Sequence, residues 1–589
     1  ESRGLGDVYK RQYGRLVRHL SRNIKEYGRK TGKEIHFYVA THSLVNYAQW
    51  KIMSPESRLL DVDEVDGFIA QVWTGTSGTG NVYEGHYKSR TFETAYLEYG
   101  IMQELVKGTD KEVWFLQDPV EDNPEHGWEE YADKYKKTLT AALFWPDVDH
   151  YEVCPWPNRV FKGRYPRKVG LAEGMIPTED MEGAKNIPDT YATFLAGMIQ
   201  TLGDMTKEES ETEKDAVGVF LADSCMYQRT YPDQVEHHGQ KINLSGMEDW
   251  MNRLIFQKEE ERQLLLSMEK MEYAYKECCA FPDWFGLTLP LLKYGLPIQP
   301  VYFDHMVRYE EYLRKYRYLI LSYEFMKPES EEFHHKLVEW VKQGGTLFYI
   351  GKDFDPYNYL QEWWQKFSCD TPAQHLFAEF GMDKEPANGC YRIGEGNVLV
   401  WNEVPALLSV NEAIADKYRN WIREGLKMGG YHWNMCNYLS VRRDPYIVIA
   451  SMQESDTGSV YTKEGLFVDL YEDKYPVVER VLVEPGQEKL LFDLEKIKED
   501  VRIIATAARI ENMACENGQL SIEAKAIDHI QVNMRIRLPG KPEDLCAHTE
   551  SGKNMELQSV WDEKSRTVLL SYRSNNEKVH ITGKLKYES

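Results

Sequence analysis

Apolar runs alternate with amphipathic stretches over the first third of the chain. Residues 13–30 carry apolar side chains at positions 13, 16, 17, 20 and 24, the spacing of an amphipathic helix. Four strand-like runs follow, separated by loops and helical stretches, and they cover residues 34–43, 65–77, 111–124 and 150–161. This alternation predicts βαβ units and a parallel sheet.

Four such units are half of a (β/α)₈ barrel. The chain opens with Glu1, residues 1–12 have no periodicity, and the stretch from Leu5 to Gln12 resembles a translated sequencing adapter. An ordinary polar arm is the alternative. We therefore expect residues 1–12 to be a non-native leader and residues 13–206 to be the C-terminal half of a barrel that is cut short.

The carboxyl ends of barrel strands are where catalytic groups lie. Glycoside hydrolysis needs two carboxyl groups, about 5–5.5 Å apart for retention or about 6.5–9.5 Å apart for inversion. The strand ends and the following loops supply Asp118, Glu121, Glu152 and Glu93 as candidate catalytic residues. Structural alternatives stand beside them: Asp118 precedes Pro119 and can shape a turn, and the helix dipole favours a first-turn carboxylate such as Glu93.

Other polar and aromatic residues at these positions are candidates for binding a sugar. Trp73 and Trp156 can stack on a sugar face, or they can plug the mouth of a barrel. His42, His86 and Arg90 can donate to sugar hydroxyls. The two histidines have no recognisable metal-ligand spacing, so neither a metal nor a cofactor is expected.

A second domain is expected over residues 214–436. An acidic linker, KEESETEKD, precedes a buried strand at 216–224, and further strands are expected at 316–324 and 346–351. The turn WVKQGGTLFYIG and the strand–helix alternation resemble a flavodoxin-like, class I glutamine-amidotransferase-like fold. No G-x-C-x-G is present, so the nucleophilic cysteine of a working amidotransferase is missing and the domain is expected to be structural.

Short alternating strands occupy residues 437–589, punctuated by Gly, Pro, Asn and Asp. This pattern predicts a β-sandwich. A plain structural sandwich is favoured here over a sugar-binding module.

Composition narrows the functional class. Aromatic residues make up 13% of the chain, which mildly favours carbohydrate binding, and the net charge of −23 argues against a nucleic-acid partner. The chain has no apolar run long enough to span a membrane, so no membrane partner is expected. The nine cysteines are scattered without metal-type pairs, so we expect reduced, mostly buried thiols in a cytoplasmic protein.

The order of a broken barrel, an inert amidotransferase-like domain and a small β domain resembles the β-galactosidases of glycoside hydrolase family 42. The resemblance rests mainly on VGVFLADS and WVKQGGTLFYIG. It implies a retaining hydrolase of a β-galactoside-like substrate and a homotrimer formed through the middle domain. The family places a Glu at the tip of barrel strand seven, where this chain has Asp118, with Glu121 as the next carboxylate.

The strand that carries the family's acid/base Glu falls in the missing part of the barrel. We therefore expect little or no activity from this chain, and turnover of chromogenic galactosides or glucosides would contradict that expectation. The alternatives are a non-catalytic carbohydrate-binding or assembly protein and, less favoured because the cysteine is absent, an amidotransferase-like hydrolase.

Overall fold

The computed structural model describes the chain except residues 1, 43–55, 73–76, 79, 85, 121–123, 171–175, 206–216, 222–233, 238–239, 244–281, 325, 354–357, 359–362 and 587–589. The chain forms two compact units. Unit 1 comprises Glu1–Val72, Thr76–Phe115 and Ser210–Cys436, and unit 2 comprises Trp73–Gly75, Leu116–Glu209 and Asn437–Ser589. The segment expected to be half of a barrel, residues 13–206, is thus divided between them.

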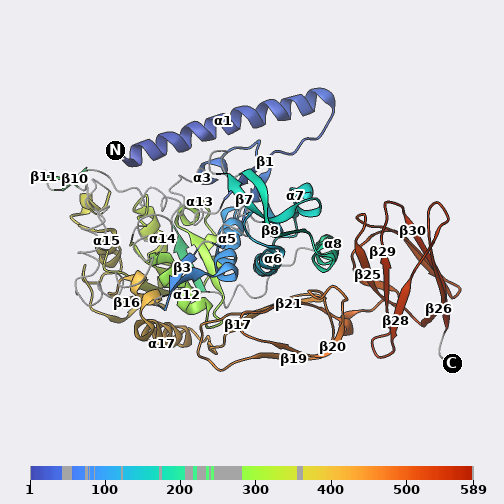
Figure 1. Ribbon diagram of the computed structural model, residues 1–589. Coiled ribbons are helices and arrows are strands. Elements are labelled where there is room, and N and C mark those ends of the chain that lie inside the picture. Colours follow the sequence, from blue (N-terminus) through green and yellow to red (C-terminus); the bar gives the residue numbers. More distant parts are fainter. Residues whose placement is uncertain are drawn as a thin grey trace. The chain divides into compact units, whose positions relative to one another are not determined.

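Unit 1 begins with a long helix and a small parallel sheet (Figure 1). Strands β1, β2 and β5 pair in parallel in that order, with Tyr38 opposite Gly67 and Gly67 opposite Glu112. A Cβ on Gly67 would lie 2.2 Å from the Glu112 carbonyl oxygen, so only glycine fits this register. The elements are α1 (Ser2–Thr31), β1 (Tyr38–Thr41), α3 (Glu56–Leu59), β2 (Gly67–Ala70), β3 (Gly80–Tyr83), β4 (His86–Ser89), α5 (Thr91–Leu105) and β5 (Glu112–Gln117).

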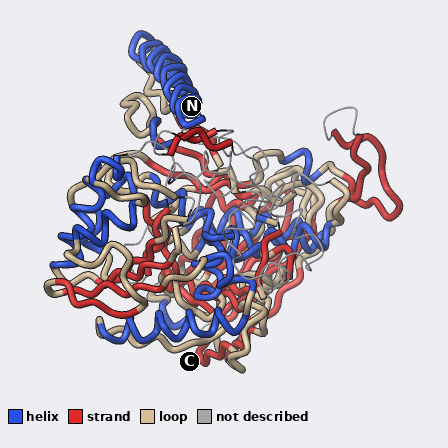
Figure 2. Tube along the Cα trace, turned by 90° about the vertical axis from the view of Figure 1, so that its left-hand side faces the viewer, coloured by secondary structure: helices blue, strands red, loops and turns tan. Residues whose placement is uncertain are grey.

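The parallel pairing predicted for the first strands is confirmed for β1, β2 and β5, and β6 (Tyr151–Val153), from the fourth predicted run, lies next to β5 in the same four-stranded sheet. That this sheet is half of a barrel stays a prediction. The residues expected to form a leader belong to the same helix, α1, as the amphipathic stretch that follows them, which Figure 2 shows as one long rod.

The rest of unit 1 is a six-stranded sheet in the order β12-β9-β13-β14-β16-β15. The first five strands are parallel, and their order follows the 2-1-3-4-5 pattern of flavodoxin-like sheets. Strands such as VGVFL and TLFYI are buried at every position, which explains their continuous apolar sequence. The strands are β9 (Val217–Leu221), β12 (Ile298–Tyr302), β13 (Tyr318–Leu321), β14 (Thr346–Ile350), β15 (Gly389–Ile393) and β16 (Gly396–Trp401).

Helices lie between successive strands of this sheet, as expected for βαβ units: α12 (Pro282–Leu292), α13 (Phe303–Arg308), α14 (Glu332–Lys342) and α15 (Pro372–Glu379). Two more helices, α16 (Pro405–Val410) and α17 (Glu412–Met428), follow its last strand, β16. A separate hairpin consists of β10 (Gln234–His237) and β11 (Gln240–Asn243).

In unit 2, two helices share a core with an antiparallel sheet of the C-terminal segment. Trp128 and Leu139 of α6 and Phe194 of α8 pack in one cluster with Val448 and Leu490 of the sheet. A hydrogen bond of 2.6 Å between the Thr140 and Tyr471 hydroxyls also links α6 to the C-terminal segment. The helical part contains α6 (Trp128–Leu143), β6 (Tyr151–Val153), α7 (Pro157–Phe161), β7 (Arg164–Gly170), β8 (Ile176–Asn186) and α8 (Asp189–Asp204). The sheet is ordered β17-β18-β21-β19-β20, from β17 (Tyr438–Arg443), β18 (Tyr446–Ser451), β19 (Tyr461–Asp469), β20 (Val477–Val483) and β21 (Glu488–Asp493).

The last part of unit 2 is a sandwich of two antiparallel sheets around a second core. Val532 and Leu570 from one sheet pack in one cluster with Ile522 and Ile581 from the other. The antiparallel sheets predicted for residues 437–589 are confirmed, as a single sheet followed by this sandwich. One sheet is ordered β22 (Arg502–Thr506), β25 (Gln531–Arg537), β29 (Thr567–Arg573), β28 (Gln558–Asp562), and the other β23 (Arg509–Glu516), β24 (Gln519–Lys525), β30 (Val579–Lys586), β26 (Lys541–Thr549), β27 (Asn554–Met555).

The cysteines that the structure describes are free thiols, as expected. Only Cys154 and Cys369 are buried, and Cys390 and Cys546 are exposed, so the expectation of mostly buried thiols is wrong for the described set. Within the described part of the chain, no helix is both long enough and apolar enough to cross a bilayer.

Candidate functional site

The strongest of the predicted carboxylates lies where β5 and β6 come together. The Cys154 N–H, just after β6, donates to the carbonyl of Gln117 at 3.0 Å, and Asp118 is the next residue of the chain. Asp118 is 5% exposed, and its Oδ1 accepts a hydrogen bond of 3.1 Å from the Val120 N–H. The carboxylate therefore also closes the turn that was the structural alternative for this residue.

Tyrosines lie around Asp118, and no local sequence pattern had indicated them. Burial first, and the negative charge of Asp118 in addition, raise the pKa of Tyr131, Tyr135 and Tyr191. Tyr191 donates to the Pro119 carbonyl at 2.8 Å, while the buried Tyr135 hydroxyl has no partner among the residues described. The groups around Asp118 therefore include protonated tyrosine hydroxyls from helices α6 and α8.

Glu152 lies on the neighbouring strand, β6, and is half-buried. Burial raises the pKa of its carboxyl group. Burial, followed by the charge of Asp118, also raises the pKa of the Cys154 thiol to about 12, which keeps this cysteine protonated and unreactive. Two carboxyl groups with different surroundings therefore lie on adjacent strand ends of unit 2.

Trp156 follows the same strand and immediately precedes α7. Its side chain is 60% exposed, which is unusual for so large an apolar group. Of the two predicted stacking residues, Trp156 is therefore available to a sugar ring, and Trp73 lies outside the described residues, as does Glu121.

The other predicted residues belong to unit 1. Glu93 in the first turn of α5 forms a buried ion pair with Lys293, whose Nζ lies 2.5 Å from Oε1. Burial alone would raise the pKa of Glu93, but the Lys293 ammonium outweighs it and the pKa is lowered. A carboxylate held in this way is suited to a structural pair rather than to proton transfer.

Arg90 precedes α5 and is 3% exposed. Its guanidinium donates to the carbonyls of Asn81, Tyr83 and His86 at 2.7, 3.2 and 3.1 Å, so it holds the β3–β4 hairpin. His86 lies exposed on β4, and half-buried His42 has its Nδ1 3.1 Å from the Gln71 carbonyl oxygen. These geometries leave the binding roles of His42, His86 and Arg90 as predictions.

Among the described residues no group of three or more His, Cys, Asp or Glu side chains is arranged to hold a metal ion. The groups that the Asp118–Glu152 region offers for chemistry are the carboxyl groups of these two residues, neighbouring tyrosine hydroxyls and the exposed indole of Trp156.

Comparison with known proteins gives results only at the level of structure. No family model matches the sequence, and no curated protein matches it. A β-galactosidase from Bacillus circulans sp. alkalophilus is similar at 10% identity and a TM-score of 0.44, over 82% of this chain and 67% of that one.

Two further similar structures carry the family 42 designation. A GH42 β-galactosidase from G. stearothermophilus, in the form of a catalytic mutant, matches at 8% identity and a TM-score of 0.34, over 94% of this chain and 63% of that chain. An exo-carrageenase of GH42 from Bacteroides ovatus matches at 10% identity and a TM-score of 0.33, over 75% of this chain and 51% of that chain. The chain spans about two thirds or less of the length of these structures, and family 42 β-galactosidases are among the proteins that it resembles.

Proposed function

We propose that the protein is a glycoside hydrolase that acts on a β-galactoside-like glycoside with retention of configuration. The observation that carries this proposal is the placement of Asp118 and Glu152 on neighbouring strands, β5 and β6, with the exposed Trp156 following β6 in the chain. Two carboxyl groups in unlike environments are what acid–base assisted glycosidic cleavage requires. The resemblance in domain order supports the substrate class.

Glu152 is assigned the general acid and base, because burial raises the pKa of its carboxyl group and so favours the protonated form that a general acid uses. Asp118 is assigned the nucleophile, because its Oδ1 is fixed by the Val120 N–H and the carboxylate is thereby oriented. In the first step Asp118 forms a bond to the anomeric carbon while the leaving oxygen takes the proton from Glu152. Water then breaks this bond, and Glu152 recovers its proton from that water.

The test compares two leaving groups on the full chain. A dinitrophenyl galactoside leaves without a proton, whereas an alkyl galactoside needs one. Glu152→Gln should therefore lower kcat/KM for the alkyl substrate by roughly 10²- to 10⁴-fold and affect the activated substrate far less. Asp118→Asn should abolish turnover of both.

Glu129→Gln, an exposed carboxylate on α6, is the matched control and should leave both rates unchanged. Turnover by the parent chain that Asp118→Asn leaves intact would refute the assignment. Turnover that Asp118→Asn abolishes supports it and contradicts the expectation of an inactive chain.

A non-catalytic carbohydrate-binding protein is the second candidate, favoured by the exposed indole of Trp156. It is supported if the parent binds galactosides, Trp156→Ala weakens that binding, and no turnover is detected. The resemblance also motivates a homotrimer, for which light scattering should give three times 68.8 kDa.

A further inference from the structure

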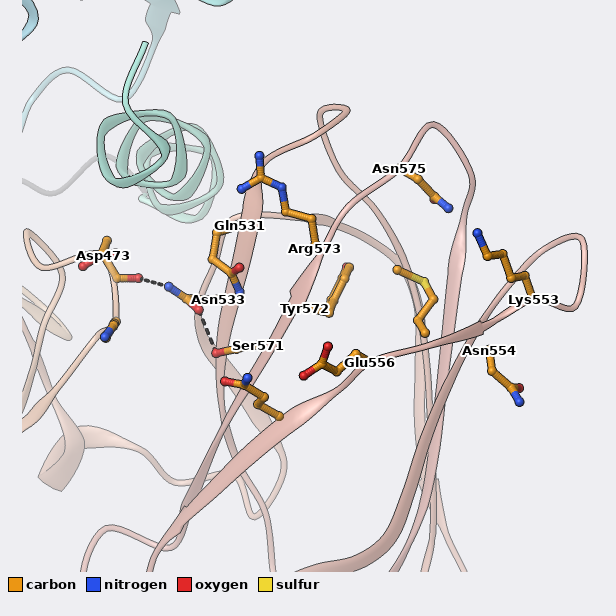
Figure 3. A pocket seen from close by; sticks show the side chains of 13 residues that line it. Asp473, Gln531, Asn533, Lys553, Asn554, Glu556, Ser571, Tyr572, Arg573 and Asn575 are labelled. Carbon is orange, nitrogen blue, oxygen red and sulfur yellow. Dashed lines mark hydrogen bonds between the residues drawn. The ribbon is translucent and has the colours of Figure 1, made fainter. Parts of the chain in front are cut away.

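A polar cleft of about 570 Å³ opens on the sandwich of unit 2 (Figure 3). Strands β25 and β29, the segment that leads from β27 into β28, and the loop between β19 and β20 line it. None of the residues of the Asp118–Glu152 region belongs to this lining. The cleft is therefore a separate feature that the glycosidase proposal leaves unused.

Strand register arranges polar side chains in rows across the floor of the cleft. Asn533 lies opposite Ser571, and Ser571 lies opposite Gln558, so β25, β29 and β28 each contribute one member. Gln531 lies opposite Arg573 in the next row. Because residues at opposite positions share a face of the sheet, these amide, hydroxyl and guanidinium groups point to the same side.

Part of this floor is held rigidly. The Ser571 hydroxyl donates to Asn533 Oδ1 at 2.7 Å, and the Asn533 amide donates to the Asp473 carbonyl at 2.7 Å, as the dashed lines in Figure 3 show. Asn533 is 3% exposed. The loop from the preceding sheet is thereby tied to the sandwich, and the cleft has a fixed wall.

Other polar groups of the cleft remain available. The exposed side chains of Glu556 and Gln558 form no hydrogen bond with any residue that the structure describes. Tyr572 also lines the cleft, but it alternates with Ser571 and Arg573 along β29, so its ring points to the other face of the sheet and packs in the core with Val532.

The charges of the lining nearly cancel. Asp473 and Glu556 stand against Lys474, Lys553 and Arg573, and Arg573 already pairs with Asp189 at 2.5 Å. A nucleic acid or a polyanion would need a basic surface, and an apolar ligand would need more than Met555 and one tyrosine ring. Closely spaced groups that both donate and accept match the adjacent hydroxyls of a sugar.

We propose that this cleft binds an uncharged oligosaccharide, as a non-catalytic site that holds a glycan chain on the C-terminal sandwich. The amides of Gln531 and Gln558 supply paired donors and acceptors, Glu556 accepts from sugar hydroxyls, and Asn533 holds the wall beside them. The site requires no turnover and does not rest on the proposed glycosidase activity.

The test is native affinity electrophoresis of the full chain in gels that contain β-1,4-galactan or dextran, with polygalacturonate as the anionic comparison. A neutral polysaccharide should retard the parent protein. Loss of a hydrogen bond weakens binding by roughly two- to tenfold. The double variant Glu556→Ala/Gln558→Ala should therefore need at least about fivefold more polysaccharide for equal retardation.

Two further variants separate binding from folding. Tyr572→Phe keeps the ring on the core face of β29 and should leave retardation unchanged. Gln519→Ala removes an equally exposed glutamine from β24, outside the cleft, and should change nothing. Equal retardation of the parent and the double variant, retardation by polygalacturonate alone, or no retardation in any gel would overturn the proposal. Turnover by the parent and by Asp118→Asn is measured in a separate assay. A failure of the glycan-binding proposal can therefore be told apart from a failure of the glycosidase proposal.

Discussion

Removal of the Lys293 ammonium should destabilise unit 1 strongly. Lys293 is 1% exposed and Glu93 8%, and their 2.5 Å contact corresponds to a Coulomb attraction of roughly 7 kcal/mol at an effective dielectric of about 20. Most of that attraction offsets the desolvation of the two charges. Lys293→Met leaves the Glu93 carboxylate buried without its partner, and loss of one member of such a pair costs about 3–5 kcal/mol.

The pH dependence of this effect has a definite sign. In the parent protein the net pKa of Glu93 is lowered, so its stabilising contribution is complete above the unfolded pKa and is lost as the pH falls through the folded one. In Lys293→Met the ammonium no longer lowers the pKa of Glu93, so burial should raise that pKa above its value in the unfolded chain. The variant should therefore gain stability from Glu93 as the pH falls, the reverse of the parent.

Hydrogen exchange of the α5 amides, followed by mass spectrometry between pH 4 and 7, measures the local opening free energy. Lys137→Met removes the exposed pair with Asp133 on α6 and should cost less than about 1 kcal/mol. The double variant Glu93→Leu/Lys293→Met should recover most of the loss. A cost below about 1 kcal/mol for Lys293→Met, or an unchanged pH slope, would refute the assignment of a buried ion pair.

Three further predictions concern packing and titration. Gly286→Ala on α12 should lower the unfolding free energy of unit 1 by about 1–3 kcal/mol, because its Cβ would lie 1.9 Å from the Pro405 carbonyl oxygen. Gly203→Ala on α8, with open space around it, should instead raise the unfolding free energy of unit 2 by about 0.5–1 kcal/mol. Urea unfolding measures both changes. Burial lowers the pKa of His334 and His375, whose Nδ1 atoms lie 2.8 Å apart. The amides of α14 should therefore lose protection from hydrogen exchange as the pH falls below about 6.5. His375→Phe should make this loss of protection depend less steeply on pH, and a steeper dependence would contradict the reasoning. Burial also raises the pKa of Glu152, so kcat/KM for an alkyl galactoside should fall as the pH rises through that pKa, and a basic limb that survives Glu152→Gln would exclude Glu152 as the acid.

Much of the secondary structure could be predicted from local pattern. The runs at 34–43, 65–77, 111–124 and 150–161 contain β1, β2, β5 and β6, although each strand is shorter than its run. Continuous apolar runs indicated the buried parallel strands, and short alternating runs indicated the C-terminal antiparallel sheets. Asp118 and Glu152 were predicted as candidate catalytic residues by the same means, because a residue at a strand end is recognised from the apolar run beside it.

Only the tertiary structure decided which surfaces meet. Lys293 lies 200 positions from Glu93, and no periodicity links them. No sequence pattern indicated that α6 and α8 share a core with the C-terminal sheet, where Thr140 lies next to Tyr471. The polar cleft also depends on the register of β25, β29 and β28.

The physical reason is the range of the forces involved. The period of apolar residues fixes the backbone conformation of one element and the side that it buries. It does not fix the partner, since burial is non-directional and any complementary apolar face satisfies it. The sequence by itself therefore determined the elements and the chemical groups at their ends, and the packing of distant segments determined which of those groups are paired, buried or available to a ligand.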